Sequence, residues 1–132
     1  MLEKIANYLT CGSAHIGKLS LHWQVNQKLK AIDPTNFKAP YKIHLGPGPN
    51  WNKPDPHWID VDIDPKRGDV VVDFAQFTAF PLANNSVSCI YGSHVFEHMS
   101  IYVTPTIFKE CCRVLQPGGV LRLILPDVEK SI

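Results

Sequence analysis

The sequence predicts an α/β domain built on a parallel β-sheet of about five strands. Three observations support this fold class. Short apolar runs with little polar interruption recur along the chain, as in strands that are buried on both faces. Turns rich in glycine, proline and asparagine separate these runs, and one amphipathic helix lies before the last of them. Glycine and acidic residues follow the runs, at the end where parallel sheets bind ligands.

Two short helices are predicted before the first strand. Apolar residues recur there at helical spacing in two sets, Leu2, Ile5, Ala6 and Leu9, and then Leu21, Val25, Leu29 and Ile32. Ser20 is suited to cap the second helix and Asp33-Pro34 to end it. We expect residues 1–40 to form an N-terminal helical cap and residues 41–132 to form the α/β domain, as one compact unit.

Five apolar runs are the predicted strands, and they span Tyr41–Leu45, Trp58–Ile63, Asp69–Phe74, Val87–Tyr91 and Val120–Leu125. Three prolines lie between Gly48 and Trp58, so the connection between the first two strands is predicted to be mostly loop. Before the fifth strand, Thr104 is predicted to cap a helix with Pro105 in its first turn. That helix is predicted to end at Gln116-Pro117-Gly118-Gly119.

Length and composition are those of one globular domain. The chain has 132 residues, of which 45% are hydrophobic and 19% charged, with a net charge of +1. These values argue against disorder and against nucleic acid as a partner. The start lacks the apolar run of a signal peptide, and no stretch is long enough to span a membrane, so we expect a cytoplasmic protein without membrane contact. The four cysteines show no CxxC spacing, which predicts neither a zinc knuckle nor a disulfide framework.

The glycine turn that follows the first strand is the most informative stretch. Gly46 and Gly48 leave no Cβ between the backbone and a molecule that lies against it. A GxG pattern alone has little specificity, because many loops contain it. Its interpretation therefore depends on the motifs that follow.

Those motifs, in order, resemble the class I S-adenosylmethionine-dependent methyltransferases, of the methyltransferase type 11-like kind. The resemblance covers residues 41 to 127. It is carried by Ile-His-Leu-Gly46-Pro-Gly48, Val61-Asp62-Ile63-Asp64-Pro65, Val72-Asp73-Phe74, Phe80-Pro81-Leu82 with Asn85-Ser86-Val87 and His94-Val-Phe-Glu97-His98, and Glu110-Cys-Cys-Arg113-Val-Leu-Gln-Pro117-Gly118-Gly119.

The resemblance implies a Rossmann-like sheet with strand order 3-2-1-4-5 and S-adenosylmethionine as cofactor, with S-adenosylhomocysteine as product. Asp62 would hold the ribose diol, because a carboxylate can accept two hydrogen bonds. Asp73 would accept from the adenine amino group. The cofactor-binding residues expected from the family motifs are His44, Gly46, Gly48, Asp62, Ile63, Asp73, Phe74 and Gly92, and no metal site is expected.

The sequence departs from the family pattern at several positions. His44 stands where an acidic residue is usual, Asn50 where a third glycine is common, and Ser88 where an acid is often found. The family also has two strands after the fifth that this sequence lacks. We therefore expect a shortened sheet whose fifth-strand edge is open to pairing, in a homodimer or with a partner chain.

Three alternative functions remain open from the sequence. A dinucleotide-binding oxidoreductase would have Gly or Ala at the position of Trp51, so that helix and strand pack closely. A zinc peptidase is suggested by His94-Val-Phe-Glu97-His98, which fits HxxEH and would place both histidines on one helix face. A non-catalytic methyltransferase-like module would complete its sheet with a partner chain.

For the predicted reaction, transfer of the methyl group to a small-molecule acceptor, the protein needs mainly to align the reactants. His94 and His98 are the candidate catalytic bases, because the ordinary pKa of histidine suits proton removal at neutral pH. The identity of the acceptor is not readable from any motif.

Overall fold

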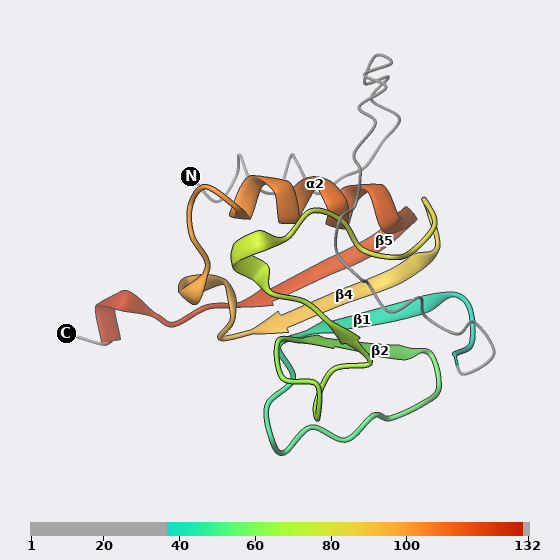
Figure 1. Ribbon diagram of the computed structural model, residues 1–132, viewed down its shortest axis with the longest axis horizontal. Helices are drawn as coiled ribbons and strands as arrows, with labels where there is room; N and C mark the ends of the chain where they lie inside the picture. The colour runs from blue at the N-terminus through green and yellow to red at the C-terminus, as the bar shows by residue number, and fades with distance from the viewer. Residues whose placement is uncertain (1–36, 131–132) are drawn as a thin grey trace, which may run out of the picture.

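The computed structural model describes residues 37–130, so the two helices predicted before Phe37 lie outside the described residues. The core is a five-stranded, all-parallel sheet in the order β3-β2-β1-β4-β5 (Figure 1). The strands are β1 (Tyr41–Leu45), β2 (Trp58–Asp62), β3 (Val70–Val71), β4 (Val87–Ser93) and β5 (Leu115–Ile124). The predicted fold class and strand order are confirmed.

One face of the sheet is covered by α2 (Thr104–Val114), which runs above β4 and β5 in Figure 1. Ile107, Cys111 and Val114 point from this helix into the core and are fully buried. They belong to one apolar cluster with the strand residues Ile43, Leu45, Ile59, Val61 and Ile90. Successive side chains of a strand point to opposite faces of a sheet, so the residues on either side of these buried ones lie on the second face.

That second face, called here the open face, carries Lys42, His44, Trp58, Asp60, Cys89, Tyr91, Val120 and Arg122. The predicted loop between β1 and β2 is confirmed, since residues 46–57 contain no helix, and residues 63–69 between β2 and β3 contain none either. Crossovers between parallel strands are right-handed. With this strand order, the crossovers from β1 to β2 and from β2 to β3 pass over the open face, whereas the crossover from β4 to β5, which contains α2, passes over the other face. Neither crossover supplies a helix to the open face.

Several predicted boundaries are wrong, and strand pairing explains most of them. β2 ends at Asp62 instead of Ile63, and β4 continues to Ser93, where it still pairs with Ile124. β3 is only two residues long, because Asp73 turns the chain into the 3-10 helix η2 (Phe74–Gln76) by accepting a hydrogen bond from the Ala75 N–H.

The ends of α2 also differ from the prediction. Its N-cap is Val103, and the Thr104 hydroxyl instead donates to the Ser100 carbonyl. The helix ends at Val114, and β5 begins directly at Leu115, which pairs with Val87. The pairing then shifts register before Cys89 meets Val120, so Gly118, with φ of 78°, lies in an irregular part of β5. Pro105 does lie in the first turn, as predicted.

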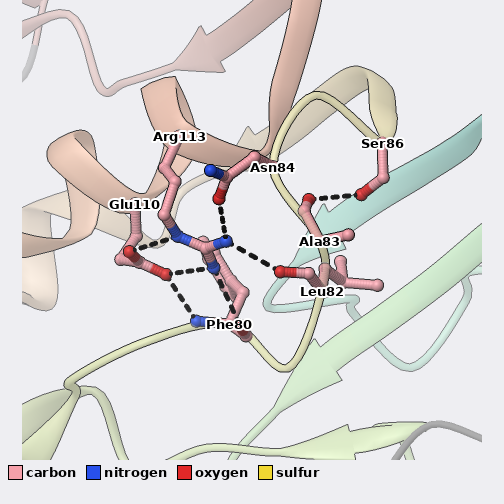
Figure 2. A network of polar contacts seen from close by, with 7 residues as sticks. All are labelled: Phe80, Leu82, Ala83, Asn84, Ser86, Glu110 and Arg113. Carbon is pink, nitrogen blue, oxygen red and sulfur yellow. Dashed lines mark hydrogen bonds and ion pairs between the residues drawn. The ribbon is translucent and has the colours of Figure 1, made fainter. Parts of the chain in front are cut away.

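A polar network fastens residues 80–86 to α2 (Figure 2). The Arg113 guanidinium donates to the carbonyl oxygens of Phe80 and Leu82, to Asn84 Oδ1, and to the Glu110 carboxylate, with its Nε 2.6 Å from Glu110 Oε1. Glu110 Oε2 also accepts the Phe80 N–H at 2.9 Å. The network holds the segment that leads into β4 at a fixed position on the helix.

Candidate functional site

The parallel strands end along one border of the sheet, called here the C-terminal edge. Gly46 follows β1, Asp62 ends β2, Asp73 follows β3, and Gly92 lies near the end of β4. The Gly46 N–H donates to the Val61 carbonyl, and the Val72 N–H donates to the Asp62 carbonyl, which ties the three turns together. The structure thus brings together four of the predicted cofactor-binding residues.

Gly46 and Gly48 have different surroundings. Gly46 has φ of 62°, and a Cβ there would lie 2.8 Å from Val95 Cγ2. A Cβ at Gly92 would also meet Val95, at 3.2 Å. Gly48 is exposed and would meet no atom within 4 Å. Val95 therefore packs against two of the predicted glycines, while Gly48 offers bare backbone to solvent or a ligand.

The carboxylate of Asp62 retains capacity to accept further hydrogen bonds. Its Oδ1 accepts the Asp64 N–H at 2.9 Å, and its Oδ2 lies 3.9 Å from Arg67 Nε. Two carboxylate oxygens offer about four lone-pair sites. Arg67 pairs more closely with Asp64, at 3.2 Å, and its side chain is 43% exposed, so it can move aside. These groups fit a ligand that brings hydroxyl donors to Asp62.

The adenine-side residues lie beside a small cavity. A cavity of 270 Å³ is lined by Phe74, Ala75, Val95, His98, Met99 and Ser100. Asp73, next to it, accepts from the Ala75 N–H and from Gln76 Nε2. Ile63 is 61% exposed after β2, as an apolar surface available to a ligand. The cavity is of a size and chemistry that fit an aromatic base.

The two candidate bases lie beside Glu97. His94 Nδ1 is 3.3 Å and His98 Nε2 is 4.0 Å from the same oxygen, Glu97 Oε1, and both imidazoles are largely exposed. His94 has φ of 52°, a conformation that non-glycine residues rarely adopt. The shared α-helix face that the zinc-peptidase alternative requires is not formed, because His94 precedes the 3-10 helix η3 (Phe96–His98). Among residues 37–130, no group of three His, Cys, Asp or Glu side chains is placed to hold a metal ion.

His44 lies in a different environment from the other predicted cofactor residues. Its side chain is buried on the open face, where its ring lies 4.2 Å from that of Trp51 and 5.0 Å from that of Tyr91. Burial lowers the pKa of His44 to about 4, although the charge of Asp62 opposes this, and its Nδ1 has no hydrogen-bond partner. Contact of His44 with a cofactor stays a prediction.

Trp51 extends this aromatic cluster. Its ring also packs against Trp58, at 5.3 Å, and its Nε1 donates to Asp60 at 3.0 Å. Asp60 is buried, which raises the pKa of its carboxyl, while Lys53 at 3.7 Å opposes the shift. Trp51 thus fastens the β1–β2 loop to the sheet, which explains how a loop can follow the glycine turn without a helix.

Residues 55–123 match the family model described as a methyltransferase domain. The chain belongs to this methyltransferase family. The methyltransferase match starts after the glycine turn and runs from β2 into β5, so it includes Asp62, Asp73 and the two histidines. Members of this family are class I S-adenosylmethionine-dependent methyltransferases. Comparisons with curated proteins and with solved structures find no match.

Some residues of the C-terminal edge could not be predicted from the sequence as part of the site. Val95 is an apolar residue between His94 and Glu97 and carries no chemical signal of its own in the sequence, yet its side chain packs against Gly46 and Gly92. Met99 and Ser100 line the cavity from a stretch without any motif.

No helix in the part of the methyltransferase that the structure describes has the length and apolar character needed to cross a bilayer.

Proposed function

We propose that this methyltransferase domain binds S-adenosylmethionine at the C-terminal edge and transfers its methyl group to a small-molecule acceptor. The observation that carries the proposal is that Gly46, Asp62 and Asp73 all lie at the strand ends of the C-terminal edge, where Phe74, next to Asp73, lines a cavity. In this proposal Asp62 holds the ribose hydroxyls, Asp73 accepts from the adenine amino group, and the backbone at Gly46 and Gly48 lies along the methionine part. The family match to residues 55–123 supports it.

The cofactor supplies an electrophilic methyl group on a positively charged sulfur, so the protein need not provide a covalent nucleophile. The residues of this chain contribute alignment of the acceptor and exclusion of water. Val95 and Met99 line an apolar wall at the edge. His94 or His98 takes a proton from the acceptor where the acceptor carries one, and both imidazoles are exposed enough to meet it.

A second candidate function is a non-catalytic module that binds a partner chain along β5. Within the described residues, β5 is the last strand of the sheet and has β4 as its only neighbour. Val120 in β5 and Leu125, the residue that follows β5, are 56% and 55% exposed. A free strand edge with exposed apolar residues is a site for strand addition.

Binding and turnover separate the two candidates. The full chain is incubated with S-adenosylmethionine and a panel of small phenols, amines, thiols and carboxylic acids, and S-adenosylhomocysteine formation is measured. The proposal predicts acceptor-dependent product that is lost in Asp73→Ala and retained in Asp55→Asn, a control in the loop before β2, where Asp55 pairs with Lys42. Cofactor binding without turnover on any acceptor would favour the binding module instead.

A further inference from the structure

Two apolar side chains fix the short segment that follows β4. Val95 packs against the C-terminal edge, since a Cβ at Gly46 would lie 2.8 Å and one at Gly92 3.2 Å from its side chain. Phe96 is buried, and its ring stacks on that of Phe108 in α2, with the ring centroids 5.2 Å apart. The polar residues of the same segment are therefore held in place between the sheet and α2.

The backbone of His94 is fixed at the end of β4. Its N–H donates to the carbonyl of Ile124, the last residue of β5, at 3.0 Å. Its φ of 52° lies in the left-handed region, which non-glycine residues rarely adopt. Such conformations persist where the surrounding structure imposes them, and they cluster at functional sites. The imidazole thus starts from a defined position at the C-terminal edge.

Glu97 distinguishes between the two histidines of the segment. Its Oε1 lies 3.3 Å from His94 Nδ1 but 4.0 Å from His98 Nε2. The first distance is within reach of a hydrogen bond, which in catalytic sites often tightens only when the substrate binds, and the second is too long for one. The Glu97 side chain is 24% exposed and that of His94 60% exposed. Glu97 is therefore the enclosed partner, and the imidazole of His94 is open to an acceptor.

This arrangement determines which ring nitrogen of His94 is free to act. A neutral imidazole carries one N–H, and its other nitrogen is a hydrogen-bond acceptor and a base. With the N–H at Nδ1 directed to the Glu97 carboxylate, the base is Nε2. The same carboxylate stabilises the positive charge that His94 gains when it takes a proton. His98 instead lines the cavity beside Phe74.

We propose that Glu97 is a positioning residue that holds His94 in its Nδ1–H tautomer, so that His94 Nε2 is the base for a hydroxyl acceptor such as a phenol. This inference rests on the proposed methyl transfer. The acceptor oxygen bonds to the methyl carbon while the bond from that carbon to sulfur breaks, and its electron pair stays on sulfur. The O–H proton passes to His94 Nε2. A carboxylic acid has already lost its proton at neutral pH, so it has no use for this pair.

Nuclear magnetic resonance of the full chain tests the tautomer without cofactor or acceptor. Long-range proton–nitrogen correlation spectra of the ¹⁵N-labelled protein are recorded at pH 8.5, where histidine side chains are ordinarily neutral. His94→Gln identifies the signals of His94. We expect the Nδ1–H tautomer of His94 in the wild type and in Asp55→Asn, and a shift to the Nε2–H tautomer in Glu97→Ala, where Nδ1 has lost its acceptor. Glu97→Met, which keeps the length of the side chain, replaces the alanine variant if that variant does not fold.

Turnover of the acceptors of the panel is the second readout. With a phenol, we expect kcat to fall at least tenfold in Glu97→Ala and on the order of 100-fold in His94→Gln, with KM for S-adenosylmethionine within about twofold of the wild type. Product from carboxylic acids alone, an Nε2–H tautomer in the wild type, or an unchanged kcat in Glu97→Ala would overturn this inference and leave methyl transfer standing. Absence of product from every acceptor in the wild type would overturn the proposed function, and this inference with it.

Discussion

Gly46 and Gly48 occupy different backbone conformations, and this difference predicts different responses to substitution. Gly46→Ala forces a side chain into positive φ and places its Cβ 2.8 Å from Val95 Cγ2. We expect it to lower the free energy of unfolding by about 1–3 kcal/mol. Gly48→Ala meets no atom and should change stability by less than about 0.5 kcal/mol. Urea denaturation of both variants checks this, and equal losses in the two would contradict the assigned packing of Val95.

The lowered pKa of His44 predicts that the free energy of unfolding depends on pH. Burial lowers its pKa to about 4 in the fold, from 6.5 in the unfolded chain. The unfolded state therefore binds more protons than the fold between these values, so His44 costs stability as the pH falls from 6.5 towards 4. Between pH 7.5 and 5 we expect the wild type to lose about 2 kcal/mol more than His44→Phe, which keeps a ring but cannot titrate.

Denaturation curves of both proteins at several pH values measure this difference. Carboxylates that titrate below pH 5 are present in both proteins and cancel in the comparison. Parallel pH profiles for the two proteins would show that His44 is solvated in the fold, contrary to its burial among the rings of Trp51 and Tyr91.

At the scale of elements, the Arg113 network should be sensitive to the shape of the cation. Arg113 satisfies the carbonyls of Phe80 and Leu82 and pairs with Glu110 (Figure 2). Lysine keeps the charge but cannot reach all these acceptors at once. We expect Arg113→Lys to cost about 1–3 kcal/mol of stability, because half-buried carbonyls lose their donors.

Lys109→Ala is the matched control for this prediction, since Lys109 is exposed on the same helix. Its effect should stay within about 0.5 kcal/mol. Hydrogen exchange supplies a second readout, because loss of the network should speed exchange at Asn85 and Ser86, whose N–H groups donate to the end of α2. Unchanged exchange in Arg113→Lys would argue against a fastening role.

The elements differ in how far the sequence predicted them. β1 agrees at both ends, because a short apolar run between a proline and a glycine leaves little freedom. β5 begins five residues earlier than predicted, because Leu115 pairs with Val87 and the strand continues through Pro117 and Gly118. Such pairing depends on register between distant segments, which local patterns do not encode. The Arg113 network was missed for the same reason, since its partners are about thirty residues away.

At the scale of the whole molecule, topology assembles the candidate site. The strand order reverses between β1 and β4, and Gly46, Asp62, Asp73 and Gly92 come together where the strands end. Their positions could be predicted because the acids and glycines follow apolar runs. The aromatic surroundings of His44 could not, since Trp51, Trp58 and Tyr91 come from three segments that only the folded sheet brings together.

The central claim is that the C-terminal edge binds S-adenosylmethionine through Asp62. Calorimetric titration of the full chain with S-adenosylhomocysteine, which cannot be consumed, tests it most directly. We predict one binding site in the wild type and in Asp55→Asn, and a loss of affinity of about 10-fold to 100-fold in Asp62→Asn, as expected when a charged acceptor of hydrogen bonds is removed. Absence of binding heat in the wild type at several temperatures, or equal affinity in Asp62→Asn, would contradict the claim.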